Sequence, residues 1–148
     1  MPPVADEKFR VARHTGRLVE SRLFALWTDA DAEQYARAFW AQARSAPGDA
    51  QPVLLADHRP VRAYPASVLA RLDQVFASLN VKLERVAVLT DKNNIGVTLQ
   101  MQGVVDRAGV SHRKLCTDPD TAVEHLRSVL TPEEVARAEA FMREWPAA

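Results

Sequence analysis

Three short predicted strands, each followed by a stretch of helical periodicity, constrain the fold of this chain most strongly. The strands cover 53–56, 85–90 and 112–117. The first is continuously apolar, and the second is apolar over 86–89, which is typical of strands buried on both faces of a sheet. Strands that alternate with helices indicate a largely parallel sheet with crossover helices. We therefore expect 53–56, 86–90 and 113–116 to lie parallel in one sheet.

The stretches between these strands carry helix starts and apolar stripes. Thr28 and Asp31 resemble a capping box, and Pro65 fits the first turn of a helix, where its missing N–H costs nothing. Asp118-Pro119 and Thr131-Pro132 provide two further starts, each with a capping residue followed by proline. The predicted helices cover roughly 28–45, 65–80, 95–108, 118–130 and 132–145.

The segment 95–108 is ambiguous. Ile95, Val97, Leu99 and Met101 alternate like a strand, yet the segment also fits a helix that stops at Gly109. Each interior glycine costs a helix about 1 kcal/mol. We favour the helix because of the segment's length and because the elements around it alternate.

The beginning of the chain adds an antiparallel pair. Residues 8–27 read as two strands joined near Thr15-Gly16, a plausible hairpin turn. The predicted fold class is α/β, with a mostly parallel four- to five-stranded sheet, an N-terminal hairpin and flanking helices. A chain of 148 residues suggests one domain, so we expect 1–7 to be a flexible tail and 8–148 a single domain.

The charge and hydropathy of the chain exclude some classes of partner. Lys plus Arg and Asp plus Glu both number 19, whereas nucleic-acid binding usually shows a basic excess. No apolar run approaches about 18 residues, so we expect no membrane span. The first ten residues lack the apolar centre of a signal peptide. We therefore expect a cytoplasmic protein that binds no nucleic acid.

No catalytic or metal-binding motif stands out. The sequence has no glycine-rich phosphate loop, no Gly-x-Ser-x-Gly and no His-Glu-x-x-His. Cys116 is the single cysteine, and we interpret it as a small core residue. We expect no catalytic residues, no cofactor and no metal, since none of the histidines pairs at the i, i+4 spacing of a helical metal site: His14, His58, His112 and His125.

The order of these elements resembles the SpoIIAA-like (STAS/SEC14-like) family of small bacterial α/β proteins. The resemblance covers roughly residues 8–142 and rests on the hairpin, on "VLLADHR" and "ERVAVLT", and on the tail "HRKLCTDPDTAVEHLRSVLTPEEVARAEAFM". It implies a signalling or protein-interaction domain rather than a catalyst. In the anti-anti-sigma branch of the family, a serine in an Asp-Ser-Ser/Thr-Gly motif is phosphorylated. Here Tyr64, Pro65 and Ala66 occupy that place, so the phosphoserine role is not carried over to the nearby Ser67.

Two groups of residues are candidates for the functional surface. The first is the loop after strand 53–56, where open parallel sheets bind ligands or partners. Alternatively, its aspartate pairs with an arginine to close the loop, and its tyrosine packs over the next helix. The loop residues are Asp57, Arg59, Arg62, Tyr64 and Ser67.

The second group lies on the apolar side of helix 132–145 and comprises Phe141, Met142 and Trp145. Aromatic residues and methionine suit the centre of an interface, so this helix could form a homodimer or bind a protein partner. Alternatively, it folds back over helix 28–45 and buries Trp40 and Trp145.

We expect a non-enzymatic cytoplasmic signalling or interaction module with an unidentified protein partner. The alternative is a binder of a small apolar or lipid-like ligand, held in a pocket between the sheet and the helices, because looser relatives in the family resemble lipid-carrying folds.

Overall fold

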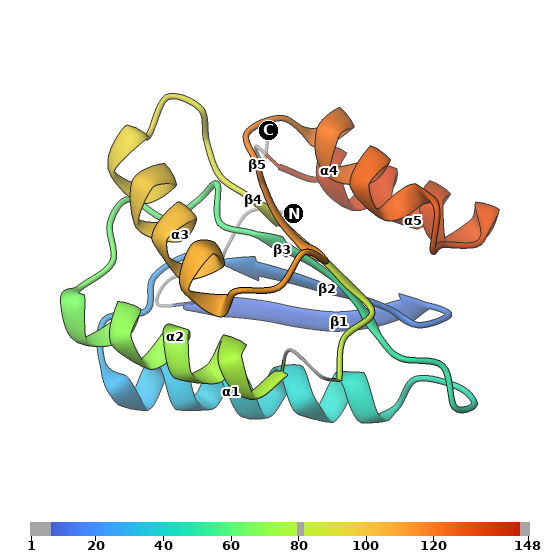
Figure 1. The fold of residues 1–148 in the computed structure, drawn as a ribbon, viewed down its shortest axis with the longest axis horizontal. Helices are drawn as coiled ribbons and strands as arrows, with labels where there is room; N and C mark the ends of the chain where they lie inside the picture. Colours follow the sequence, from blue (N-terminus) through green and yellow to red (C-terminus); the bar gives the residue numbers. More distant parts are fainter. Residues whose placement is uncertain (1–6, 80–81, 146–148) are drawn as a thin grey trace.

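The computed structural model describes residues 7–79 and 82–145. These residues form a five-stranded mixed sheet with helices on both faces (Figure 1). The predicted tail, 1–7, lies almost entirely outside the described residues. In chain order the elements are β1 (Phe9–Thr15), β2 (Leu18–Leu23), α1 (Asp29–Arg44), β3 (Val53–Asp57), α2 (Ala66–Leu79), β4 (Arg85–Leu89), α3 (Ile95–Ala108), β5 (Arg113–Cys116), α4 (Pro119–Arg127) and α5 (Pro132–Arg143).

The sheet has the strand order β1-β2-β3-β4-β5. Only β1 and β2 pair antiparallel, and β2, β3, β4 and β5 run parallel to one another. The α/β class, the N-terminal hairpin and the parallel arrangement of the strands predicted at 53–56, 86–90 and 113–116 are therefore confirmed. The segment 95–108 is the helix α3, which begins at the cap Asn94 and ends at Gly109 in the left-handed conformation.

The direction of the strand order decides which face each helix covers. Every crossover from β2 to β5 moves the chain to the next strand on the same side. Right-handed crossovers of this kind place α1, α2 and α3 on one face, where they pack against the sheet in one apolar core. The helices α4 and α5 form a second core on the opposite face (Figure 1). The suggestion that helix 132–145 folds over helix 28–45 is therefore wrong.

The sequences of β3 and β4 are almost continuously apolar because both strands contribute side chains to both cores. In β3, Leu54 and Ala56 point into the core under α1–α3, whereas Val53 and Leu55 point into the core under α4 and α5. Successive side chains of a strand point to opposite faces, so a strand covered on both sides needs apolar residues at nearly every position.

The terminal helix α5 buries its apolar side on its own domain. Phe141 and Met142 are only 4% and 3% exposed, and both belong to the core under α4 and α5. They do not form the free surface that the sequence suggested, because α4 and α5 alone cover this face of the sheet. Trp145 is half-buried, and the centre of its ring lies 6.2 Å from that of Phe24.

The start of α5 is tied to the hairpin turn. Glu134 completes the capping box of α5 with Thr131, and its other carboxylate oxygen accepts a hydrogen bond of 2.7 Å from the backbone N–H of Arg17. Gly16 has a φ of 55°, and a Cβ atom at this position would clash with the carboxylate of Glu134. The turn therefore needs glycine for its conformation and for its close approach to α5.

We predict that Gly16→Ala lowers the free energy of unfolding by clearly more than Gly48→Ala. Gly48 has a φ of 67° but nothing within 4 Å of a built Cβ, so the control carries only the backbone strain, about 1 kcal/mol. The additional loss for Gly16→Ala over Gly48→Ala measures the free-energy cost of displacing the Glu134 carboxylate. Chemical denaturation of both variants checks this, and equal losses would contradict the role assigned to Glu134.

Candidate functional site

A buried aspartate lies at the carboxyl edge of the sheet, where β3 ends. Asp57 is fully buried, and its two carboxylate oxygens accept four hydrogen bonds. Oδ1 accepts from the backbone N–H and the Nε of Arg59, at 3.0 and 2.9 Å. Oδ2 accepts from Arg22 Nε at 2.8 Å and from Arg59 Nη2 at 3.1 Å. A carboxylate has about four acceptor sites, so Asp57 has none left for a substrate.

The two arginines also hold the end of α5. Arg22 Nη2 donates to the carbonyl of Phe141 at 2.7 Å, and Arg59 Nη2 donates to that of Met142 at 3.0 Å. The last carbonyls of a helix lack partners within the helix and carry the negative end of its dipole. The guanidinium of Arg22 also lies 4.0 Å from the centre of the Phe141 ring. Arg22, Asp57 and Arg59, here called the arginine–aspartate cluster, thus fasten α5 to the sheet.

The interpretation of Asp57 as a loop-closing ion pair is confirmed, but the sequence did not identify Arg22 as its second partner. The sequence held one indication of this: Glu20 and Arg22 are charged residues in a strand that also contains Leu18, Val19 and Leu23. Both are buried, and Glu20 pairs with Arg137 of α5 through two hydrogen bonds of 2.7 Å.

A second buried pair lies in the same loop. His58 Nδ1 and the hydroxyl of Tyr64 are 2.7 Å apart, and both side chains are buried. Burial lowers the pKa of His58 to about 4 and raises the pKa of Tyr64 well above its ordinary value. Both groups are therefore neutral at physiological pH. The backbone of Tyr64 is held by Gln100 of α3 through two hydrogen bonds, which places the tyrosine against the helix layer.

The structure does not bring the five predicted loop residues into one site. Asp57 and Tyr64 are buried in separate polar pairs, and Arg59 is partly buried beside Asp57. Arg62 and Ser67 are exposed, and Ser67 is the second residue of α2. Only Arg59 of this group both joins the arginine–aspartate cluster and reaches a surface depression.

That depression, here called the carboxyl-edge hollow, lies between the start of α4 and the end of α5 and has a volume of about 380 Å³. It brings together Arg59 from the predicted loop with Met142 and Trp145 from the predicted partner surface. Met142 contributes to its wall although little of the side chain is exposed. The lining residues are Arg59, Pro119, Asp120, Val123, Glu139, Met142, Arg143 and Trp145.

The lining of the hollow combines apolar side chains with two arginines and two carboxylates, and none of its residues is a cysteine, serine or histidine. Cys116 is buried, and burial raises its pKa to about 11, so the thiol is protonated at neutral pH. Within 7–79 and 82–145, no group of three or more His, Cys, Asp or Glu residues could hold a metal ion.

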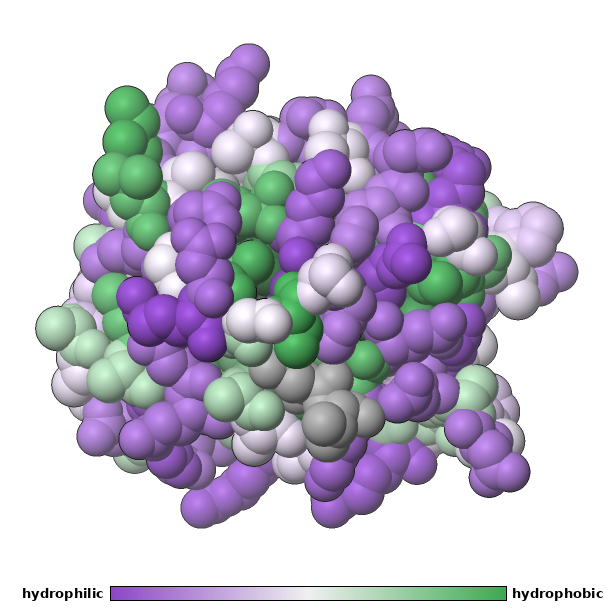
Figure 2. Space-filling model, in the orientation of Figure 1, coloured by the Kyte–Doolittle hydropathy of each residue, from purple (hydrophilic) through white to green (hydrophobic). Residues whose placement is uncertain are grey.

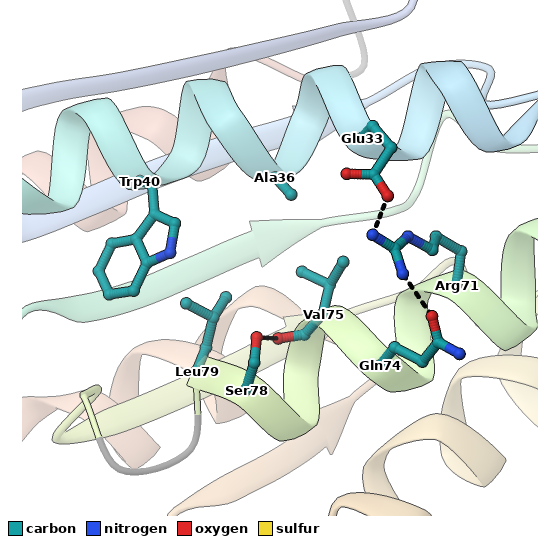
Figure 3. Close-up of a pocket in the computed structure, with 8 residues that line it drawn as sticks. All are labelled: Glu33, Ala36, Trp40, Arg71, Gln74, Val75, Ser78 and Leu79. Atoms are coloured by element: carbon teal, nitrogen blue, oxygen red, sulfur yellow. Dashed lines mark hydrogen bonds and ion pairs between the residues drawn. The ribbon is translucent and has the colours of Figure 1, made fainter.

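A second depression separates α1 from α2 (Figure 3) and has a volume of about 240 Å³. Arg71 reaches across it to pair with Glu33 and also bonds Gln74 within α2. Ser78 Oγ donates to the carbonyl of Val75 at 2.8 Å. The two charged side chains of this groove, Glu33 and Arg71, are therefore paired with each other.

No protein-family model and no curated protein matches the sequence. Among the described helices, none combines the length and the apolar character needed to cross a membrane.

We predict that Asp57→Asn lowers the free energy of unfolding by about 3–5 kcal/mol, because the buried guanidinium of Arg22 loses its buried carboxylate partner and keeps only the more exposed Glu144, at 3.9 Å. The matched control is Asp73→Asn, which breaks the exposed Asp73–Arg107 pair and should cost no more than about 1 kcal/mol. Urea denaturation of the two variants measures the difference. Similar small losses would show that the cluster does not hold the fold together.

We also predict that His58 makes the fold sensitive to acid. The unfolded chain protonates this histidine near its ordinary pKa of 6.5, whereas the folded protein does so only at about 4. The contribution of His58 to stability is therefore greatest above pH 6.5, and it falls by about 1.4 kcal/mol per pH unit between about pH 6 and the folded pKa of about 4. His58→Gln should remove this part of the pH dependence of the free energy of unfolding, measured by urea denaturation at several pH values. Parallel stability profiles for the wild type and His58→Gln would contradict this assignment.

Proposed function

We propose that this chain is a non-enzymatic cytoplasmic interaction module of STAS-like fold, which binds a protein partner in the carboxyl-edge hollow. One observation carries the proposal. The carboxylate of Asp57 beneath this edge is fully hydrogen-bonded to Arg22 and Arg59. In contrast, the half-buried Trp145 and charged side chains of both signs line the depression above it.

The composition of the hollow supports a polypeptide partner. Tryptophan, methionine and arginine are enriched in protein interfaces, and tryptophan and arginine often carry most of the binding energy. Trp145 leaves part of its ring exposed beside Arg143 and Arg59. Asp120 and Glu139 supply negative charge on the same rim, so we expect the partner to present an apolar side chain flanked by charges of both signs.

The position of the hollow also supports this function. Open α/β sheets bind their ligands just outside the carboxyl ends of the strands. The arginine–aspartate cluster fixes α5 against this edge, so the wall formed by Met142 and Arg143 is rigidly placed. The order of strands and helices is compatible with the STAS-like assignment, which points to the same class of function.

The alternative of a small apolar ligand receives less support. Such a ligand needs space between the sheet and the helices. The core under α1–α3 is instead occupied by large, fully buried side chains, including Tyr35, Phe39, Leu72, Phe76 and Met101.

We predict that a photo-crosslinking amino acid at Arg143 captures a partner in the native host, and that the same probe at Gln74 in the α1–α2 groove does not. Trp145→Ala should then weaken the captured complex about tenfold or more, as expected for an interface anchor. Trp27→Ala is the control, because Trp27 is 55% exposed and lies outside the hollow. Equal capture at both positions, or an unchanged affinity for Trp145→Ala, would reject the hollow as the binding site.

A further inference from the structure

The strand β5 leaves one edge of the sheet open. It pairs with β4 on one side, and no described strand pairs with it on the other. The carbonyls of His112 and Cys116 bond backbone N–H groups of β4 or its end. Backbone groups alternate in direction along a strand, so the N–H and C=O of Leu115 point away from β4. An unpaired edge of this kind is a template for a further strand.

Helix α3 carries an exposed apolar stripe next to this edge. Ile95 and Leu99 are 70% and 67% exposed. Together with Gln102 and Asp106 they repeat at helical spacing along one side of α3. Gln102 and Asp106 line a depression of about 340 Å³ that also includes Leu115 of β5.

The other flank of α3 faces α2. Gln100 bonds the backbone of Tyr64 just before α2, and Arg107 pairs with Asp73 of α2 at 2.9 Å. The apolar stripe therefore lies on the side of α3 that looks over the open edge of β5. Figure 1 shows β5 between α3 and α4, and Figure 2 shows hydrophobic areas among the hydrophilic side chains of this view.

We propose that a second copy of this chain occupies this edge, so that two β5 strands pair antiparallel about a two-fold axis and extend the sheet across both copies. In a pair centred on Leu115, each Leu115 exchanges two N–H···O bonds with Leu115 of the second copy. The α3 helices of the two copies then lie on the same face of the joined sheet, and their Ile95–Leu99 stripes meet beside the axis.

On the opposite face, Lys114 and Cys116 lie on the side of β5 that faces α4. In the pair centred on Leu115, Lys114 of each copy stands opposite Cys116 of the other.

A second copy fits better than an isolated peptide strand. Stable interfaces bury about 1,200–2,000 Å², and the few paired residues of β5 contribute only part of that area. A second copy supplies its own exposed Ile95 and Leu99, which cover those of the first copy. This dimer uses neither α5 nor the carboxyl-edge hollow, so it stands apart from the proposed function and from a dimer through the terminal helix.

The test compares Leu115→Pro with Leu115→Ala. Proline removes only an N–H that points away from β4, and such positions on edge strands accept proline. Both variants lose the leucine side chain, but alanine keeps the outward donor. Light scattering at micromolar concentration should give wild-type protein a mass near twice 16.4 kDa. Leu115→Pro should raise the dissociation constant at least tenfold more than Leu115→Ala does.

Two further measurements do not depend on the folding of the proline variant. Leu99→Lys changes an exposed residue and should also shift the protein to monomer. Hydrogen exchange of the Leu115 amide should slow as the protein concentration rises. The proposal is overturned if the wild type is a monomer, if the proline and alanine variants have equal effects, or if exchange at Leu115 does not depend on protein concentration. These outcomes also cover the case in which the edge binds a foreign peptide and not a second copy.

Discussion

The buried carboxylate of Asp57 is the interaction on which the arrangement of the terminal helix depends. A buried charge is tolerated only when opposite charges and hydrogen bonds compensate it. Arg22 and Arg59 provide this compensation for Asp57, and they use their remaining N–H groups on the last carbonyls of α5. The aspartate, the two arginines and the helix end therefore satisfy one another, and removing one member leaves hydrogen-bonding groups of the others without that partner.

Further polar ties explain why a helix rich in charged residues packs so closely on the sheet. Glu20 of β2 holds Arg137 in the middle of α5, and Glu134 joins its first turn to the hairpin. Together with the arginine–aspartate cluster, these contacts fix α5 along its length while Phe141 and Met142 fill the core beneath it. The buried charges of Glu20, Arg22 and Asp57 are thus all engaged in contacts that hold the fold together.

The sequence predicted the features that depend on residues close together in the chain, such as the starts of the helices. Thr28 and Asp31, Asp118 and Thr131 begin their helices as expected, because caps involve residues three positions apart. Arg22 escaped prediction as a partner of Asp57, since the two are 35 positions apart and meet only through the pairing of β2 with β3. The face covered by α5 could not be predicted for the same reason, so the sequence leaves open whether Phe141 and Met142 lie in the core of the monomer or on a partner surface. Trp145 and Arg59 were identified separately, but only the folded chain brings them into one hollow.

The two edges of the sheet differ for a topological reason. The hairpin strand β1 lies at one edge, where α1 contacts it on one face and α5 on the other. Each right-handed crossover then adds a strand on the side away from β1, so the last strand and the last crossover helix remain at the far edge. After β5 the chain turns to the opposite face, and no described segment pairs with the outer edge of β5. The outward backbone groups of Leu115 and the side chains of Ile95 and Leu99 are left open by the same feature of the topology, which is why we propose one symmetric contact for all three.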